Sequence, residues 1–447
     1  MCLQKAKYLL VSILAALVLG FPPNPAQAES DIFVELSKET QSAVNIAVLG
    51  FMPLAGEVDE DLAEKTRNIL ENDLSLFELF VPVKHNLYSG IEGEIQTGRL
   101  NYAAWSRLGV QWLIKGQYQK SISGEKYKFV FRLYDVVNEH FLLGKRYQGR
   151  KSYMRKMMHR FADEVMEQLT GKRGVADTRL AFLSRTPQGK EIYVVDFDGA
   201  NVKKLTDERS IILAPDWSPD GRSIVYTSYQ DHNPDLILLA TNGSRRRPLL
   251  KLPGLNSAPA WSPDGTKISL VLSKDSNSEI YVLNRWRKLT RLTRHFNIDT
   301  SPTWSPDGKK IAFTSDRSGT GRPQIYIMDA ESGDRTGVMR ITFQSRYNDN
   351  PAWSPDGDKI AYASLIKGRF QIKIYHLETR ETTAVTTGPG SKEEPTWSPD
   401  SLFLAYRMTR GRSSSIHIKR VGGKKSRQLT FLPEGGTSPT WSPYPKK

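Results

Sequence analysis

The stretch Trp217-Ser218-Pro219-Asp220-Gly221 decides the fold, because the chain repeats it. Trp-Ser-Pro returns at spacings of 43 to 49 residues, and its copies begin at Trp217, Trp261, Trp304, Trp353, Trp397 and Trp441. Six of the 9 tryptophans belong to this motif, so the recurrence is not accidental. Asp-Gly follows four copies, and we expect a tight type I′ hairpin there, since glycine takes a positive φ without steric cost. The tryptophan is large enough to fill the space between adjacent twisted sheets.

Each copy of the motif is followed by short apolar segments that predict three more strands. The first complete copy continues with Ile224-Val225-Tyr226 and with residues 236–239, and later copies end near Leu-Thr or Ile-Thr. Four short strands in about 44 residues are typical of one blade of a WD40-like β-propeller. The sequence therefore predicts an all-β propeller over residues 175–447.

The two ends of the repeat array complement each other. Residues 180–206 supply three strands without an opening strand, whereas Thr440-Trp441-Ser442 at the C-terminus is an opening strand without followers. Joining them makes a sixth blade and removes exposed sheet edges, which favour aggregation. We therefore predict six blades closed by the C-terminal strand.

Residues 1–28 have the features of a secretory signal peptide. Lys5 and Lys7 precede an apolar run over residues 8–19, which is shorter than the roughly 20 residues of a membrane span. Ala26-Gln27-Ala28 is a typical cleavage site. Cys2, the single cysteine, would leave with this peptide, so an exported protein without disulfides or cysteine-based metal sites is expected.

Residues 29–170 predict a separate α/β domain. Strands are expected over residues 44–49 and 80–83, and a meander over 112–147. Helices are expected over 59–77, 101–108 and 152–169, the last with Ser152 as its N-cap. Residues 29–40 form either a free arm, which a partner could capture by β-augmentation, or a docked edge strand.

The positive charge is concentrated in the repeat region. The chain has 63 basic and 48 acidic residues, and its net charge is +15. The whole excess falls after residue 170, where a basic surface could attract acidic proteins, anionic polymers or membranes. Export argues against nucleic acid as the partner.

The sequence offers no catalytic or cofactor motif. Gly-x-Ser-x-Gly, His-Glu-x-x-His and phosphate-binding glycine loops are absent, and the 7 histidines have no metal-binding spacing. We therefore expect no enzyme activity, cofactor or metal.

Several stretches together carry a family resemblance. They are residues 103–109 (AAWSRLG), residues 167–174 (EQLTGKRG), the six Trp-Ser-Pro copies and the terminal Trp-Ser-Pro-Tyr. In this order they make the chain resemble the TolB family, the periplasmic propeller proteins of the Tol-Pal cell-envelope system. The resemblance implies a monomeric, non-enzymatic periplasmic adaptor that approaches membranes only through its partners. Such an adaptor helps to maintain the outer membrane and to constrict it at division.

The resemblance also implies two partner sites. The propeller mouth would bind a Pal-like peptidoglycan-associated lipoprotein through Leu255, Asn256, Ser257, Asp299 and Thr300. By extension to later loops we add Tyr347, Asn348, Glu393 and Glu394. The N-terminal arm would bind a TolA-like inner-membrane protein through Asp31, Ile32, Phe33, Val34, Glu35 and Leu36.

A second hypothesis remains open on the sequence alone. Propeller channels often hold ligands, so the channel could bind or cleave a small anionic ligand or a glycan. The mouth loops contain acidic residues but no general base paired with a nucleophile.

Overall fold

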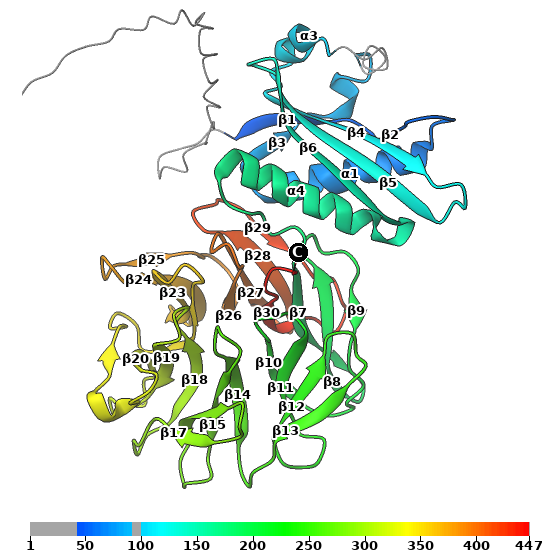
Figure 1. Ribbon diagram of the computed structural model, residues 1–447. Coiled ribbons are helices and arrows are strands. Elements are labelled where there is room, and N and C mark those ends of the chain that lie inside the picture. The colour runs from blue at the N-terminus through cyan, green and yellow to red at the C-terminus, as the bar shows by residue number, and fades with distance from the viewer. Residues whose placement is uncertain (1–42, 92–99, 447) are drawn as a thin grey trace, which may run out of the picture.

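The computed structural model describes residues 43–91 and 100–446 of the chain. These residues form an α/β domain and a six-bladed β-propeller, which confirms the predicted fold class (Figure 1). The predicted signal peptide and N-terminal arm lie outside the described residues. Within the described ranges, every helix is too short or too polar to cross a membrane.

The N-terminal domain is built on one mixed sheet of six strands. The sheet order is β3-β1-β4-β5-β6, β2 pairs with β4, and β4, β5 and β6 form the predicted antiparallel meander. The elements are β1 Val44–Val48, β2 Met52–Pro53, α1 Glu60–Leu76, β3 Phe80–Pro82, α3 Tyr102–Arg107, β4 Trp112–Lys120, β5 Lys126–Asp135, β6 His140–Arg150 and α4 Met154–Thr170.

The two long helices differ in how they begin. Asp59 caps α1, because its carboxylate accepts the N–H of Leu62 at 3.0 Å, as expected for an N-cap. The predicted cap Ser152 of α4 is wrong. A 3₁₀ turn, Lys151–Tyr153, runs directly into α4, so the residue at the N-cap is Tyr153 and no side chain caps the helix.

The propeller has six four-stranded antiparallel blades. From the innermost to the outermost strand, the first blade consists of β10 Ile212–Trp217, β11 Ser223–Ser228, β12 Asp235–Ala240 and β13 Arg246–Leu250, and the second of β14 Asn256–Trp261, β15 Lys267–Leu272, β16 Glu279–Asn284 and β17 Leu289–Arg291. The third consists of β18 Asp299–Trp304, β19 Lys310–Ser315, β20 Gln324–Asp329 and β21 Met339–Arg340, and the fourth of β22 Asn348–Trp353, β23 Lys359–Ile366, β24 Arg369–His376 and β25 Thr382–Ala384. The fifth consists of β26 Ser391–Trp397, β27 Phe403–Arg410, β28 Ser413–Arg420 and β29 Ser426–Gln428. The sixth consists of β30 Thr437–Trp441, β7 Arg179–Thr186, β8 Gly189–Asp196 and β9 Lys203–Lys204.

The repeated turn is not the predicted type I′ hairpin. Type I′ needs a positive φ at both central residues. Here Gly221 has a φ of 69°, whereas Asp220 is not among the residues with positive φ. The Gly221 N–H donates to the Ser218 carbonyl at 2.8 Å, and the Ser218 hydroxyl accepts the Ser223 N–H at 2.9 Å. The serine thus supports a longer loop in which only glycine needs the left-handed conformation.

The repeated tryptophan fills the space between blades, as predicted. Trp304 ends β18 of the third blade and packs in one buried cluster with Ile280 and Val282 of the second. Its indole Nε1 donates to the Ala260 carbonyl at 3.1 Å, which joins the two innermost strands.

The C-terminal strand closes the ring, as predicted. Strand β30 pairs with β7, placing Trp441 opposite Leu180. The Trp441 indole donates to the Thr178 hydroxyl at 2.9 Å, and the Ser442 N–H donates to the Arg179 carbonyl at 2.8 Å. Segments more than 250 residues apart in sequence therefore form one blade.

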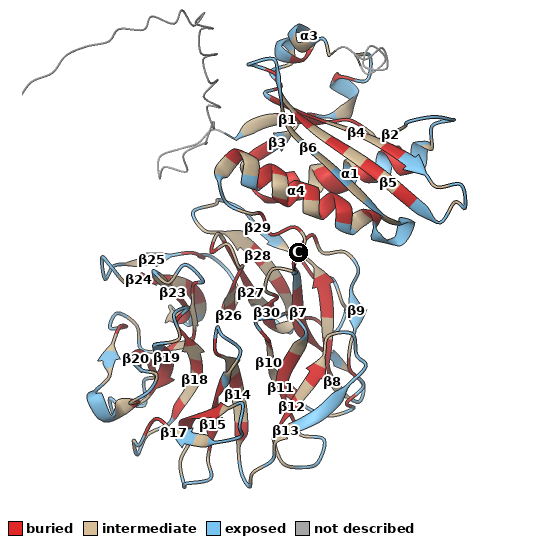
Figure 2. Cartoon of the chain, viewed as in Figure 1, coloured by how far each residue is buried: buried red, intermediate tan, exposed pale blue. Residues whose placement is uncertain are grey.

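The two domains share one hydrophobic core. Phe77 at the end of α1 stacks on Phe197 of the sixth blade, with ring centroids 6.1 Å apart, and Phe197 lies against Trp441. Arg155 of α4 forms an ion pair with Asp198 at the same contact. Figure 1 shows α4 lying over the fifth and sixth blades, and Figure 2 shows the buried side of α4 in red. The N-terminal domain is therefore fixed to one end of the propeller.

Deleting residues 437–447 should destabilise the protein, because the sixth blade would lose its innermost strand and the shared core would lose Trp441. We expect a lower melting temperature and aggregation, measured by circular dichroism and light scattering. Deletion of residues 445–447 is the control, since it leaves β30 intact. Equal melting of the two truncated proteins would contradict closure by β30.

Candidate partner-docking face

The free end of the propeller is set by the direction of the strands. In an antiparallel blade the innermost strands all begin at one end of the ring, where the connections from outermost to next innermost strand also lie. The N-terminal domain packs against residues at the opposite end, such as Phe403 at the start of β27 and Trp441 at the end of β30. Within residues 43–91 and 100–170 of this domain, nothing covers the end where the inner strands begin, and we call that end the free face.

Large apolar side chains project from the loops of the free face. All belong to connections that lead into an innermost strand, and their exposed fractions lie between 53% and 81%. We call this set the apolar rim: Ile211, Phe296, Ile298, Phe343 and Phe431. Exposed apolar side chains that cluster on one face mark interaction sites more often than scattered ones do.

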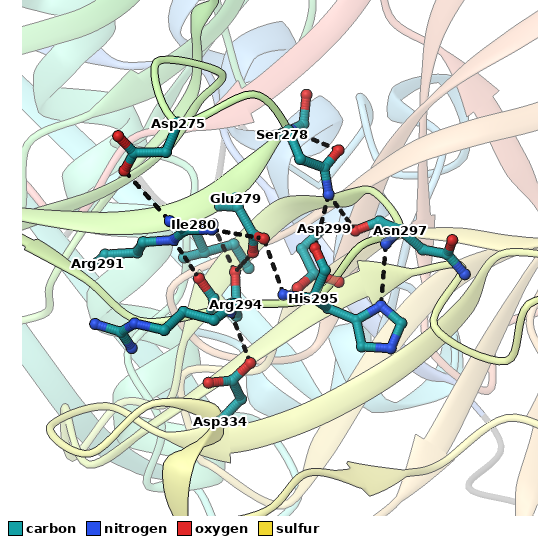
Figure 3. Close-up of polar contacts among 12 residues, drawn as sticks. Asp275, Ser278, Glu279, Ile280, Arg291, Arg294, His295, Asn297, Asp299 and Asp334 are labelled. Atoms are coloured by element: carbon teal, nitrogen blue, oxygen red, sulfur yellow. Dashed lines mark hydrogen bonds and ion pairs between the residues drawn. The ribbon is translucent and has the colours of Figure 1, made fainter.

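Buried polar contacts hold the loop that carries Phe296 and Ile298 (Figure 3). The buried Glu279 carboxylate accepts the His295 N–H at 2.9 Å, an Arg291 Nη2–H at 3.1 Å and the Thr293 hydroxyl. The Asn277 amide donates to the carbonyls of His295 and Asn297, both at 2.8 Å. Since the backbone is bound on both sides of Phe296, this residue is presented by an ordered loop.

The next loop around the ring is held in a similar way. The Gln324 carbonyl oxygen accepts the Thr342 hydroxyl and the Asn348 amide, both at 2.8 Å, and the Gln324 amide donates to the Ser345 carbonyl at 3.0 Å. Phe343 follows Thr342 directly. Two neighbouring loops thus present apolar residues from preformed conformations, which lowers the entropy cost of binding.

Seven of the nine predicted Pal-contacting residues lie at or just before the starts of inner strands, at the free face, whereas Glu393 and Glu394 lie further along β26. Three of them are buried and bonded internally. The Asn256 amide donates to the Leu252 carbonyl at 2.6 Å, Asn348 binds Gln324, and the Asp299 carboxylate accepts an Arg317 Nη2–H at 2.8 Å. Burial raises the pKa of Asp299. These side chains shape the loops rather than the exposed surface.

The other six predicted residues are half-buried: Leu255, Ser257, Thr300, Tyr347, Glu393 and Glu394. Arg407 bridges the two glutamates, at 2.8 Å to Glu393 and 3.3 Å to Glu394. The predicted TolA-contacting residues, Asp31 to Leu36, lie outside the described residues.

Sequence reasoning missed the apolar rim. Part of the signal was present, because Phe343 and Phe431 each follow the threonine that ends a blade. An apolar residue at that position looks like the next core residue of a strand. Its exposure becomes evident only when the strand is seen to end at the threonine.

The channel wall is tied together by bonds between neighbouring inner strands. The residue before each of three motif tryptophans accepts the N–H of the next blade's tryptophan: Asp216 from Trp261 at 2.8 Å, Thr303 from Trp353 at 3.5 Å and Thr396 from Trp441 at 3.3 Å.

Every inner strand also has a bulge at a non-glycine residue with a φ between 46° and 56°: Ala214, Ala258, Ser301, Asn350, Glu394 and Ser438. Bulges re-aim side chains near functional sites.

Comparison with protein families gives matches over both domains. Residues 166–445 match the family described as the TolB beta propeller domain, and residues 32–142 match the TolB amino-terminal domain. A crystal structure of TolB from Acinetobacter baumannii is similar over 90% of this chain and 98% of that one, with a TM-score of 0.79 and 28% identity.

Curated relatives give the same family name. The Tol-Pal system protein TolB of Bordetella pertussis is 34% identical over 73% of this chain and 71% of that protein. The proteins of the same name from Syntrophotalea carbinolica and Geobacter sulfurreducens are both 38% identical, over 43% and 48% of this chain. The chain spans about half the length of these last two relatives, 45% and 48%.

Asp216 should make stability depend on pH. Burial raises its pKa from 3.8 to about 6. The unfolded chain ionises this residue near pH 4, so the folded state should lose stability as the pH rises from about 4 through 6. Asp216→Asn cannot ionise and keeps an oxygen for the Trp261 N–H. The melting temperature of this variant minus that of wild type should therefore be larger at pH 8 than at pH 4.5. The stability that wild type loses over this range through Asp216 is up to ~3 kcal/mol. A difference that does not change with pH would contradict this assignment.

Proposed function

The chain belongs to the TolB family of Tol-Pal system proteins, and from this premise we propose that it is a non-enzymatic periplasmic adaptor. Its free face binds a Pal-like outer-membrane lipoprotein, and residues 29–40 bind a TolA-like inner-membrane protein. By linking the two membranes it maintains outer-membrane integrity and aids constriction at cell division. The protein is a monomer in this role.

The observation that carries the proposal is the apolar rim. Protein interfaces are enriched in aromatic residues at their centre, and a few well-placed aromatic residues supply most of the binding energy. Phe296 and Phe343 are exposed, adjacent in blade order and held by the buried contacts of Glu279 and Gln324. Of the nine residues named from the sequence, Asn348 supports the loop of Phe343 through its bond to Gln324.

The position of the N-terminal domain supports a second, separate site. This domain packs at the end of the propeller opposite the free face, and the residue range 29–40 precedes β1, an interior strand of its sheet. We assign the two partners to different segments of the chain: the propeller loops for the Pal-like protein and residues 29–40 for the TolA-like protein. If Pal-like binding changes how the arm is held, the two binding events are coupled, typically by 1–3 kcal/mol.

The channel is a poorer candidate for an anionic ligand. Its inner strands contribute the acidic residues Asp216, Asp349, Glu393 and Glu394. Arg407 is the cation that pairs with the two glutamates. Carboxylates at these positions repel a bound anion, so the charge of the channel favours the adaptor over a channel that binds anions.

Replacing rim aromatics with charge should weaken binding of the Pal-like partner. For Phe296→Asp and Phe343→Asp we expect dissociation constants raised about tenfold or more, because the partner would have to bury a charge in place of an apolar anchor. The measurement is titration calorimetry with the purified periplasmic domain of the Pal-like protein from the same organism. Trp286→Asp is the matched control, since Trp286 is 72% exposed but lies in the turn between β16 and β17, at the other end of the ring.

Two other outcomes for these three variants would contradict the prediction. Loss of binding in Trp286→Asp with full binding in both phenylalanine variants would place the partner at the opposite end. Full binding in all three variants would remove the rim from the proposal.

Deletion of residues 29–40 should abolish binding of a purified TolA-like periplasmic domain and leave Pal-like binding measurable. The reason is that the arm, not the propeller, supplies the strand or segment that this partner captures. The control is Phe296→Asp, which should retain the TolA-like interaction. A deleted protein that still binds the TolA-like domain with wild-type affinity would refute the arm as its site.

A further inference from the structure

One position of the repeat differs in chemistry from its equivalents. In every blade the third strand places one residue opposite a large apolar residue of the second strand, and the register gives the pairs Phe182–Tyr193, Tyr226–Ile237, Leu270–Tyr281, Phe313–Tyr326, Tyr362–Lys373 and Tyr406–His417. Five blades have a ring or an aliphatic side chain on the third strand. The fourth has Lys373.

This position faces the preceding blade. Tyr326, its equivalent in the third blade, packs in one cluster with Ile280 and Val282 of the second. Tyr362, the pair partner of Lys373, packs with Ile325 and Ile327 of the third blade. Lys373 therefore points a cation into an interface that its equivalents fill with apolar atoms.

A cavity of about 650 Å³ lies at this place between the third and fourth blades. Tyr362 and Tyr375 line it from the fourth blade, and Arg340 from β21 of the third. Strand β21 has only two residues and pairs only with Tyr326 and Ile327, so it leaves part of the facing sheet uncovered. The volume is within the range of small-molecule sites, about 300–1,000 Å³.

The charges of the cavity favour an anion. Its lining contains the cations Arg340, Lys373 and Arg380 and one carboxylate, Glu381. Arg340 is held in place, because its Nε–H donates to the Thr342 carbonyl at 2.6 Å and its guanidinium lies 4.8 Å from the Phe343 ring. Within residues 43–91 and 100–446, the side chains of Lys373 and Arg380 have no hydrogen bond or ion pair.

A buried hydroxyl group in the lining points to the same conclusion. Ser364 is fully buried, lines the cavity, and its Oγ has no hydrogen-bond partner in the part of the chain that the structure describes. The equivalent serines of other blades are satisfied: Ser228 donates to Glu208 at 2.8 Å and Ser184 donates to the Gly435 carbonyl at 2.6 Å. An unpaired buried hydroxyl destabilises the fold, and a hydrogen bond to a polar ligand would remove that cost.

We propose that this cavity binds a small sugar that carries a carboxylate or a phosphate group. The anionic group lies between Lys373 and Arg380, and the body of the ligand lies against Tyr362 and Tyr375. Ser364 donates to a ligand oxygen. The cavity adjoins the apolar rim, because Phe343 belongs to the rim and also lines the cavity.

The test is titration calorimetry and thermal melting of the full chain with three sugars at matched ionic strength. Glucuronate and glucose 6-phosphate carry the anion in two forms, and glucose is the neutral control. We expect heat of binding and a higher melting temperature with one or both anionic sugars and neither effect with glucose. The difference between the two anions identifies which group the cavity prefers.

Two variants locate the effect. Lys373→Tyr introduces the residue found at the equivalent positions Tyr193, Tyr281 and Tyr326, so this variant should fold and melt at a higher temperature than wild type. Its affinity for the anionic sugars should fall at least tenfold. Lys373→Met keeps a side chain of similar length without the charge, and it should also bind the anionic sugars more weakly. Lys309→Met, at an exposed turn lysine, should leave it unchanged.

Three results would overturn the proposal. The first is an equal response to glucose, and the second is an anion response that persists in both Lys373 variants. The third is no response to any of the sugars, which leaves a cavity that holds only water. If Lys373→Tyr instead abolishes binding of the Pal-like protein while no sugar binds, the cavity takes an acidic side chain of that partner and the sugar proposal fails.

Discussion

Closure of the ring by β30 is the constraint on which the rest of the structure depends. Trp441 pairs opposite Leu180, packs between the first and last parts of the propeller, and also contacts Phe197 beneath the N-terminal domain. One side chain therefore serves both the sixth blade and the domain interface. Each blade packs only on its neighbours, so an open array would leave the first and last blades without a packing partner on one side. Closure by the two ends of the chain supplies that partner. The free face and the fixed position of the N-terminal domain both follow from that meeting.

The repeat places polar side chains where the loops need support. Near the end of most blades a buried threonine accepts the N–H of an isoleucine of the third strand, as Thr293 does from Ile280 at 2.9 Å and Thr342 from Ile325 at 2.9 Å. The same threonine donates to Glu279 or Gln324, which then bind the backbone that follows. Buried groups satisfied in this way rigidify the structure around them. The propeller thus presents apolar residues to solvent from loops that its own core holds.

The sequence was sufficient to predict the architecture because its signals are local and periodic. Trp-Ser-Pro marks every inner strand, and the incomplete first and last units predict closure. The type of turn and the cap of α4 were predicted wrongly, because Ser218 and the 3₁₀ turn at Lys151–Tyr153 compete with the simpler local rule. The exposure of Phe296 could not be predicted, since it depends on Glu279 and Asn277 binding the loop from a neighbouring hairpin. The family resemblance named residues at the propeller mouth, but it did not name the exposed residues of the apolar rim.

The six blades repeat the same structural positions within one chain, so a residue that breaks the common pattern stands out. Six blades impose nearly the same surroundings on each register position, so packing alone favours the same kind of side chain at all six. His417 satisfies this requirement as a neutral ring, because burial lowers its pKa to about 4. Lys373 instead places an amine where the equivalent positions of the other blades have a ring or an aliphatic side chain. Packing between the blades does not explain this residue, and a bound anion is the physical reason that we propose for it.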